Sequence, residues 1–413
     1  MTSGRLGPTR VARWTAPVLE SASLATPQRA ATADNRAVAL SIFAVTAAVN
    51  LQMPLYRTYA QAAGVGNTAT TVVFAFYVVG LVPTLMVFGG ISDRVGRRAS
   101  ILAGLLASLL ATGIMIVSPG LRLLGLSRVL QGVGVGLTLG AASAYLAERR
   151  PTGAPASRSA TTVTIASSLG FGGGALFTGL LLMAHPTLRP ASFWVVAALA
   201  IVCAASVARI EEERPRQGAL MRLPIVRLPT IVSNLAILVA WAVTGVIISL
   251  LPGQLAAHHL SAWAGPALFL VNGTGALVQP LAMRLSARNS LLVGFACLPV
   301  GFTVLLAGAA TGTLALVLGG ASIAGAACYG FTYQGGLAGI TEGEPALRAR
   351  AVAGYFLFAY LGFALPSVAL GVLSDRYGLI PALHGFGFVL VATCVALAIV
   401  AKLTLPARQS AVH

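Results

Sequence analysis

The chain has 413 residues, of which 57% are hydrophobic and only 9% are charged. A soluble domain carries about 25% charged residues, so this chain has too few to cover a surface that faces water. In a soluble protein the net charge of +17 would suggest a nucleic-acid partner, but here the basic residues lie between long apolar segments. The composition therefore predicts a protein embedded in a lipid bilayer, without nucleic acid as a partner.

The first segment, residues 1–35, is rich in Arg, Pro, Ser and Thr and lacks an apolar stretch of signal-peptide length. We predict a disordered basic tail here, followed by a helix that is retained in the mature protein. The four cysteines lie inside apolar segments at spacings that do not suit a metal site, so we expect no metal and no cofactor. They are Cys203, Cys297, Cys328 and Cys394.

A helix needs about 20 mostly apolar residues to span a bilayer. Segments of this kind that contain no Asp, Glu, Lys or Arg are 37–56, 58–92, 99–121, 159–188, 190–208, 228–283, 289–347, 351–374 and 377–401, and 123–147 joins them if Arg128 lies inside a helix. Two of them, 228–283 and 289–347, are long enough for two helices each. We expect the first to break at Pro252-Gly253 and His258-His259, and the second near residues 308–313. The sequence thus predicts an all-α membrane protein of twelve transmembrane helices.

The basic residues predict the orientation, because Lys and Arg concentrate in cytoplasmic loops. With both termini in the cytoplasm, the basic residues left outside are Arg57, Arg122, Arg189 and Arg376. The longest polar interruption divides the helices six and six. The predicted organisation is an N-terminal bundle (36–208), a cytoplasmic linker (209–229), a C-terminal bundle (230–404) and a short cytoplasmic tail (405–413). Transporters are often built from two such halves, with the substrate site between them.

The loop after the second helix carries the most specific motif. It reads Gly89-Gly-Ile-Ser-Asp93-Arg94-Val-Gly96-Arg97-Arg98 and resembles the signature loop of the major facilitator superfamily, Gly-x-x-x-Asp-Arg-x-Gly-Arg-Arg/Lys. The resemblance implies that Asp93 faces the positive N-terminus of helix 11 and holds the halves together on the cytoplasmic side in the outward-open state. It also implies a charge relay from the loop arginines to an acid at the end of helix 4, a position that Glu148 occupies.

Helices 4 and 5 carry further resemblances to the same family. Helix 4 reads Arg128-Val-Leu-Gln131-Gly132-Val-Gly134, similar to the family's Arg-x-x-Gln-Gly-x-Gly, which implies a coupling role for Arg128, Gln131 and Gly132. An Arg inside a membrane usually faces a cavity, although it can also extend to the interface. Close helix packing is the better explanation for the spacing of Gly132, Gly136 and Gly140. Residues 170–179 resemble a degraded form of the motif that marks antiporters, which suggests the drug:proton antiporter branch and leaves the direction of transport open.

A second copy of the loop pattern follows helix 11. Residues 371–378 and 89–96 both read Gly-x-x-Ser-Asp-Arg-x-Gly. The predicted topology puts the copy at Asp375 outside and the copy at Asp93 in the cytoplasm, as expected for inverted repeats. The equivalent loop after helix 8, residues 283–288, lacks the Asp, so the halves are not equivalent in function.

Polar side chains within the helices are the candidates for the substrate cavity, although each could instead bond to a neighbouring helix. They are Asn50, Gln52, Tyr56, Trp241, Asn272, Gln279, Tyr329, Tyr333, Gln334 and Tyr355, with Gln131, Asn234 and Tyr360 as further members. None of the ten acidic residues lies at mid-membrane depth, which excludes a carboxylate proton carrier in the cavity. Asp93, Glu148, or a histidine such as His258 or His259 could still carry protons.

These features predict a secondary transporter in a bacterial plasma membrane. We expect a monomer that exports small amphiphilic molecules, neutral, zwitterionic or anionic, in exchange for protons. The alternative is a facilitator or importer of a small metabolite without carboxylate coupling. A non-transporting sensor with this fold is disfavoured by the intact loop motif. An intramembrane enzyme is disfavoured because no Ser with a paired Lys or His, no HExxH and no Gly-x-Asp pair is present at the required depth.

Overall fold

The computed structural model describes residues 17–87, 90–149, 157–211, 223–341 and 347–406. The N-terminal half begins with α1 (Pro17–Asn50), which continues through a 3-10 turn, η1 (Met53–Leu55), into α2 (Tyr56–Ala63). It is completed by α3 (Asn67–Val87), α4 (Ile91–Val95), α5 (Arg97–Val117), α6 (Leu121–Glu148), α7 (Ser157–Ala184) and α8 (Ala191–Val207). The short helix α4 lies in the loop between two spanning helices, so this half contributes six spans.

The C-terminal half repeats the same plan. It contains η2 (Leu228–Thr230), α9 (Ile231–Ala257), η3 (Ser261–Trp263), α10 (Ala264–Ala282), α11 (Ala287–Thr311), α12 (Leu314–Gly325), η4 (Ala326–Thr332), α13 (Tyr333–Thr341), α14 (Arg348–Tyr377) and α15 (Leu379–Thr404). The tenth span is α12, η4 and α13 together, and η4 is a π-helix. Short π-helical segments within α-helices are frequent at functional sites.

The predicted helix count is confirmed. Ten helices in the described residues are long and apolar enough to cross a membrane, and α8 and α10 supply the other two spans. The break near residues 308–313 is also confirmed, because α11 ends at Thr311 and Gly312 adopts a left-handed conformation (φ 71°).

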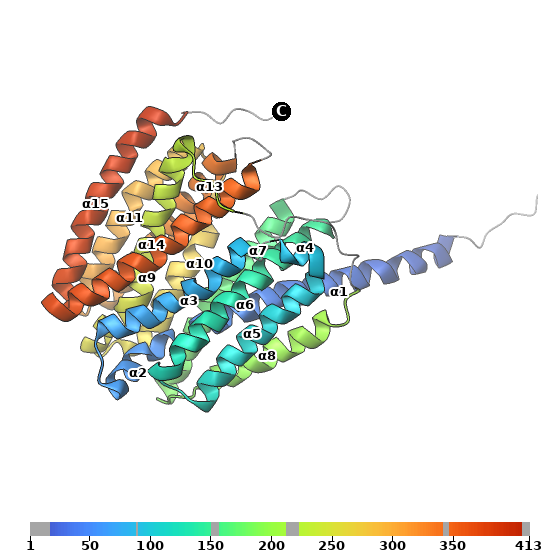
Figure 1. The fold of residues 1–413 in the computed structure, drawn as a ribbon, viewed down its shortest axis with the longest axis horizontal. Coiled ribbons are helices and arrows are strands. Elements are labelled where there is room, and N and C mark those ends of the chain that lie inside the picture. Colours follow the sequence, from blue (N-terminus) through green and yellow to red (C-terminus); the bar gives the residue numbers. More distant parts are fainter. Residues whose placement is uncertain (1–16, 88–89, 150–156, 212–222, 342–346, 407–413) are drawn as a thin grey trace, which may run out of the picture.

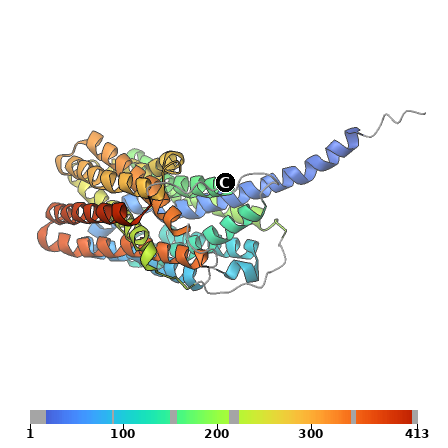
Figure 2. The same ribbon diagram turned by 90° about the horizontal axis from the view of Figure 1, so that it is seen from above.

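Two further expectations are wrong in part. The chain turns after His258, as expected at His258-His259, but Pro252 lies inside α9 and does not break the helix. A membrane helix tolerates an internal Pro because neighbouring groups can satisfy the freed carbonyl. The predicted disordered tail is also too long, since α1 already begins at Pro17 and extends beyond the bundle (Figures 1 and 2). Residues 1–16 lie outside the described part of the chain.

The two halves meet along two pairs of helices, α3 with α14 and α7 with α10 (Figure 1). Both contacts are closest at the ends that the basic residues assign to the outside. A Cβ atom on Gly265, at the start of α10, would lie 2.5 Å from the carbonyl oxygen of Ala175 and 3.0 Å from the Cα atom of Gly179. Glycine is therefore required where the α7 and α10 backbones touch, and the outer ends of the halves are packed together.

Candidate functional site

A cavity of about 350 Å³ lies between the halves. Its walls come from the cytoplasmic parts of α3, α6, α7, α10 and α14, together with α1, α9, the π-helix and the first residue of α13. The lining residues are Val49, Asn50, Tyr77, Leu85, Leu139, Gly140, Ser143, Val163, Thr164, Ser167, Ser168, Phe171, Trp241, Ile248, Asn272, Gln279, Tyr329, Tyr333, Phe356, Tyr360 and Phe363. The cavity thus extends from mid-membrane toward the cytoplasm, while α7 and α10 are in backbone contact at their outer ends.

The wall from the C-terminal half is aromatic. The ring of Trp241 lies 5.1 Å from that of Tyr360, 5.9 Å from that of Tyr329 and 6.0 Å from that of Phe363, measured between centroids. The indole Nε1 of Trp241 is buried without a hydrogen-bond partner among the described residues. A buried N–H donor without a partner is costly. This wall therefore offers flat aromatic faces to a molecule in the cavity, and its polar groups are the tyrosine hydroxyls and the amides of Asn272 and Gln279.

The wall from the N-terminal half carries small polar groups. Thr164, Ser167, Ser168 and Phe171 on α7 line the cavity together because their spacing of three and four residues places them on one helical face. Asn50 on α1 donates a hydrogen bond from Nδ2 to the carbonyl oxygen of Phe171 at 2.8 Å, which fixes its amide at this wall. The hydroxyl-rich face of α7 was not predicted, although its spacing is visible in the sequence.

The lining residues that the structure describes include no Asp, Glu, Lys, Arg or His. The cavity therefore has a wide apolar surface with neutral hydrogen-bonding groups and lacks a fixed charge. Most ligand sites combine apolar walls with a few placed polar groups, and this cavity has the size and lining of such a site.

Six of the ten predicted cavity residues line it: Asn50, Trp241, Asn272, Gln279, Tyr329 and Tyr333. The other four do not. Gln52 is buried and donates from Nε2 to Gln131 Oε1 at 3.0 Å. The fully buried Tyr355 donates its hydroxyl to the carbonyl oxygen of Tyr333 at 3.0 Å, and Tyr56 and Gln334 are outside the lining.

Arg128 is the most unusual buried group. Its side chain is fully buried but does not line the cavity, so the expectation that it faces one is wrong. Its Nη1 donates to the carbonyl oxygen of Val49 at 2.7 Å and to Gln131 Oε1 at 2.9 Å, and its guanidinium carbon lies 4.9 Å from the ring centroid of Tyr77. The backbone, an amide and an aromatic face thus stabilise the cation in place of a carboxylate.

The glycines of α6 have a packing role. A Cβ atom on Gly132 would collide with the carbonyl oxygen of Tyr77 on α3, and one on Gly134 would lie 2.7 Å from Ser108 Oγ on α5. Gly132 therefore lets α6 approach α3 closely, and that approach brings the rings of α3 over Arg128.

The cytoplasmic motif loop forms a chain of charges. Arg97 Nη2 lies 2.6 Å from Asp93 Oδ1 and 2.9 Å from Glu148 Oε1, so the loop and the end of α6 share one guanidinium. Gly96 has a φ of 97°, a conformation that favours glycine, and Arg98 donates from Nη1 to the carbonyl oxygen of Ile210 at 3.1 Å. The structure thus places the loop arginine Arg97 in an ion pair with Glu148.

Two parts of the prediction for this loop remain untested. Gly89 lies outside the described residues. The contact between Asp93 and the start of α14 is expected in the outward-open state, whereas the outer ends are packed together in this structure.

The remaining arginine of the motif, Arg94, is exposed.

The outer copy of the motif joins the two halves. Asp375 on α14 accepts hydrogen bonds from the backbone N–H groups of Asn67 and Thr68, both at 2.8 Å, and from the Thr68 hydroxyl at 2.6 Å. Asn67 is the first residue of α3 in the N-terminal half. The copy at 371–378 thus holds the outer ends of α3 and α14 together.

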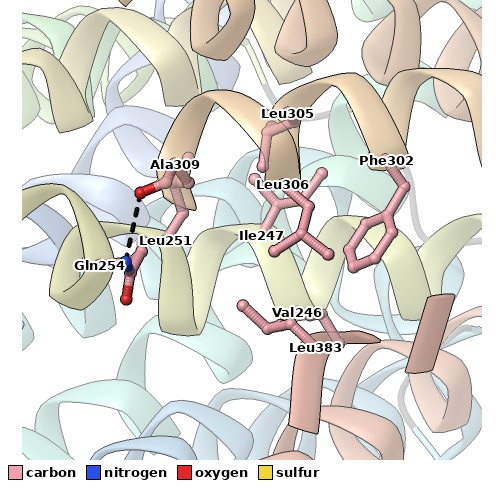
Figure 3. A pocket seen from close by; sticks show the side chains of 9 residues that line it. All are labelled: Val246, Ile247, Leu251, Gln254, Phe302, Leu305, Leu306, Ala309 and Leu383. Carbon is pink, nitrogen blue, oxygen red and sulfur yellow. Dashed lines mark hydrogen bonds between the residues drawn. The ribbon is translucent and has the colours of Figure 1, made fainter. Parts of the chain in front are cut away.

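A much smaller space of about 10 Å³ lies inside the C-terminal half, between α9 and α11 with Leu383 of α15 at its edge (Figure 3). Apart from Gln254 its lining is apolar, and Gln254 donates from Nε2 to the carbonyl oxygen of Ala309 at 3.2 Å. A space of this size accommodates about one water molecule, so it is a packing defect and not a substrate site.

Two six-helix halves that are closed at one end and enclose a cavity toward the other define a membrane transporter of the alternating-access type. The comparisons identify the family. A model described as Major Facilitator Superfamily matches residues 38–367, and the chain belongs to this family of secondary transporters. It is a multi-pass membrane protein and not an enzyme.

Two solved structures share the fold. The chain superimposes on a mutant of the nucleoside transporter NupG with a TM-score of 0.72 and 13% identity, covering 90% of this chain and 100% of that one. It also superimposes on a bacterial homologue of the human lysosomal transporter Spinster in an inward-facing and occupied conformation. In that case the TM-score is 0.69 and the identity 14%, and 93% of this chain and 99% of that one are covered. No curated protein matches the chain significantly.

Proposed function

We propose that this chain exports small amphiphilic molecules that are neutral, zwitterionic or anionic, in exchange for protons across a bacterial plasma membrane, and that it acts as a monomer. The proposed cargo is inferred from the lining of the cavity between the halves. Aromatic rings from the C-terminal half face hydroxyl and amide groups from the N-terminal half, without an acidic side chain among the described lining residues. A molecule with one flat apolar face and one hydrogen-bonding edge matches both walls.

Charge selects against cations in this proposal. An organic cation that enters the cavity loses hydration, and the described lining offers aromatic faces and neutral polar groups but no carboxylate to compensate for the loss. A fixed charge beside the cavity is the buried cation Arg128, whose guanidinium lies over the ring of Tyr77, itself a lining residue. Both features favour cargo that is neutral or carries a negative group.

Proton exchange is the second part of the proposal and rests on the resemblance of residues 89–98 and 127–136 to the family's motifs. The proton carriers that we propose are Asp93 and Glu148, which share Arg97 at the cytoplasmic end. A facilitator or importer without proton coupling is the alternative, and the cavity without acids is the observation that favours it.

Proteoliposomes loaded with a pH-sensitive dye distinguish the two mechanisms. The probes are a panel of fluorescent aromatic compounds of similar size, each neutral, anionic or cationic. We expect uptake of the neutral and anionic probes to be driven by a pH gradient and to move protons in the opposite direction. Uptake of those probes without proton movement would support the facilitator, and a preference for the cationic probes would contradict the proposed cargo.

Trp241 provides the test at the site itself. Trp241→Ala removes the ring that packs against three other aromatic rings of the wall, and we expect the half-saturating probe concentration to rise about tenfold. Trp194→Ala is the matched control, because the side chain of Trp194 on α8 is 59% exposed on the outside of the bundle. Equal effects of the two substitutions would show that the wall does not bind cargo.

A further inference from the structure

The outer copy of the repeated motif makes an unusually well-formed contact between segments about 300 residues apart in the chain. One oxygen of Asp375 accepts from the N–H of Asn67, and the other accepts from the N–H and the hydroxyl of Thr68. The first N–H groups of a helix have no partner within the helix and carry its partial positive charge. The carboxylate from one half thus caps a helix of the other half.

The backbone on both sides is shaped for this contact. A Cβ atom on Gly66, just before α3, would lie 2.6 Å from each carboxylate oxygen of Asp375. A Cβ atom on Gly371, one turn before Asp375 on α14, would collide with the hydroxyl of Thr71 and lie 3.1 Å from the carbonyl oxygen of Asn67. Two glycines therefore permit the close approach, one from each half.

The contact exists in only one of the two states that alternating access requires. It joins the outer ends of α3 and α14, so it breaks whenever the outer ends separate to admit or release cargo. An interaction made in one state only shifts the equilibrium toward that state by its own free energy. Asp375 therefore favours the closed outer end and the inward-facing conformation.

We propose that Asp375 is the outer latch of the transport cycle: its carboxylate caps the N-terminus of α3 and sets the fraction of molecules whose outer end is closed. This positioning role is independent of the cargo and the coupling ion proposed above. Arg376, the next residue, is exposed, and the bonds of Asp375 go to two amides and a hydroxyl of α3.

The test measures the distance between spin labels on the outer ends of the two halves. Gln61 on α2 and Tyr377 on α14 are both exposed and are replaced by labelled Cys. Of the native thiols, Cys203, Cys328 and Cys394 are buried, and the half-buried Cys297 is replaced by Ser. The protein is purified at full length in lipid nanodiscs, without cargo, and the distance distribution gives the ratio of open to closed outer ends.

We expect Asp375→Asn to raise that ratio about tenfold, because hydrogen bonds to a charged acceptor are about twice as strong as those to a neutral one. Thr68→Val, which removes one of the three bonds, is expected to raise it about threefold. Thr68→Ser keeps the hydroxyl and is the matched control, with a ratio within about twofold of the parent protein.

A distance distribution in Asp375→Asn that equals the parent's overturns the proposal. Should that variant not yield folded protein, the Thr68 pair decides: a larger ratio for Thr68→Val than for Thr68→Ser supports the latch, and equal ratios overturn it.

Discussion

The two copies of the Gly-x-x-Ser-Asp-Arg-x-Gly motif have nearly the same backbone but different partners. Gly96 and Gly378 close the copies with φ values of 97° and 89° and the same ψ of 153°, and each directly precedes a spanning helix. In the inner copy Asp93 pairs with Arg97 of its own loop, at 2.6 Å. In the outer copy Asp375 bonds to α3 of the opposite half.

The residue after the last glycine explains the difference. Arg97 stands four residues after Asp93, whereas Leu379 stands four residues after Asp375. Arg97 offers a cation that Asp93 can reach within its own loop, and Glu148 holds that cation in place. Leu379 is apolar and partly buried in the core, so the outer carboxylate finds its donors across the interface. One side chain thus distinguishes a loop that bonds within its own half from a loop that bonds to the other half.

The largest effect is expected where the outer face closes by backbone contact. Gly265→Val places a branched side chain against the backbone of α7, where even a Cβ atom would lie 2.5 Å from the carbonyl oxygen of Ala175. We expect the outer ends to stay apart and probe transport in proteoliposomes to fall more than about tenfold. Gly113→Ala on α5 is the control, because a Cβ atom there would have no neighbour within 4 Å. Normal transport by Gly265→Val would show that this contact is not part of the cycle.

The next largest effect tests the role of the residue that follows the motif. Leu379→Arg gives the outer copy the cation of the inner copy, and we expect it to draw Asp375 away from α3. The ratio of open to closed outer ends, measured with labels at Gln61 and Tyr377, is expected to rise about fivefold. Leu379→Met retains the apolar character and is the control. Equal ratios for the two variants would contradict the explanation given above.

A smaller and opposite effect is expected from the inner copy. Asp93→Asn weakens the contact that the resemblance predicts between Asp93 and the start of α14, so the equilibrium should move further toward the inward-facing state. We expect the ratio of open to closed outer ends, measured with labels at Gln61 and Tyr377, to fall about threefold in protein whose melting temperature is unchanged. A ratio equal to that of the parent, in folded protein, would rule out the inner latch.

The smallest effect is expected from the charge beside the outer latch. Arg376→Ala removes an exposed cation, and surface charges contribute little. The ratio of open to closed outer ends should stay within about twofold of the parent's, in contrast to Asp375→Asn. A tenfold change would mean that Arg376 and not the cap on α3 controls the outer end.

The amino-acid sequence predicts the spans and the motif well because both depend on local features. Long apolar segments must form helices in lipid, and the spacing of residues 89–98 is visible without a structure. The break predicted at Pro252 was wrong because neighbouring groups in a helical bundle can satisfy the carbonyl that an internal Pro leaves free. Predicting where a helix ends therefore requires knowledge of its packing as well as of its sequence.

The cavity was only partly predictable. A polar residue in a membrane helix can face either a cavity or a neighbouring helix, and the sequence does not give the rotation of each helix. Trp241 and Gln279 line the cavity, whereas Gln52 and Tyr355 bond to neighbouring helices. The partner of Asp375 was missed because it lies at the start of a helix in the other half, and a sequence repeat does not show which segments meet.

The most direct test of the account measures both ends of the protein in the same preparations. Labels at Gln61 and Tyr377 report the outer end, and labels at the exposed Val95 and Ala349 report the inner end. Alternating access predicts that Asp375→Asn lengthens the outer distance and shortens the inner one, and that Asp93→Asn does the reverse. Distances that lengthen together at both ends, or that do not respond to either substitution, would contradict it.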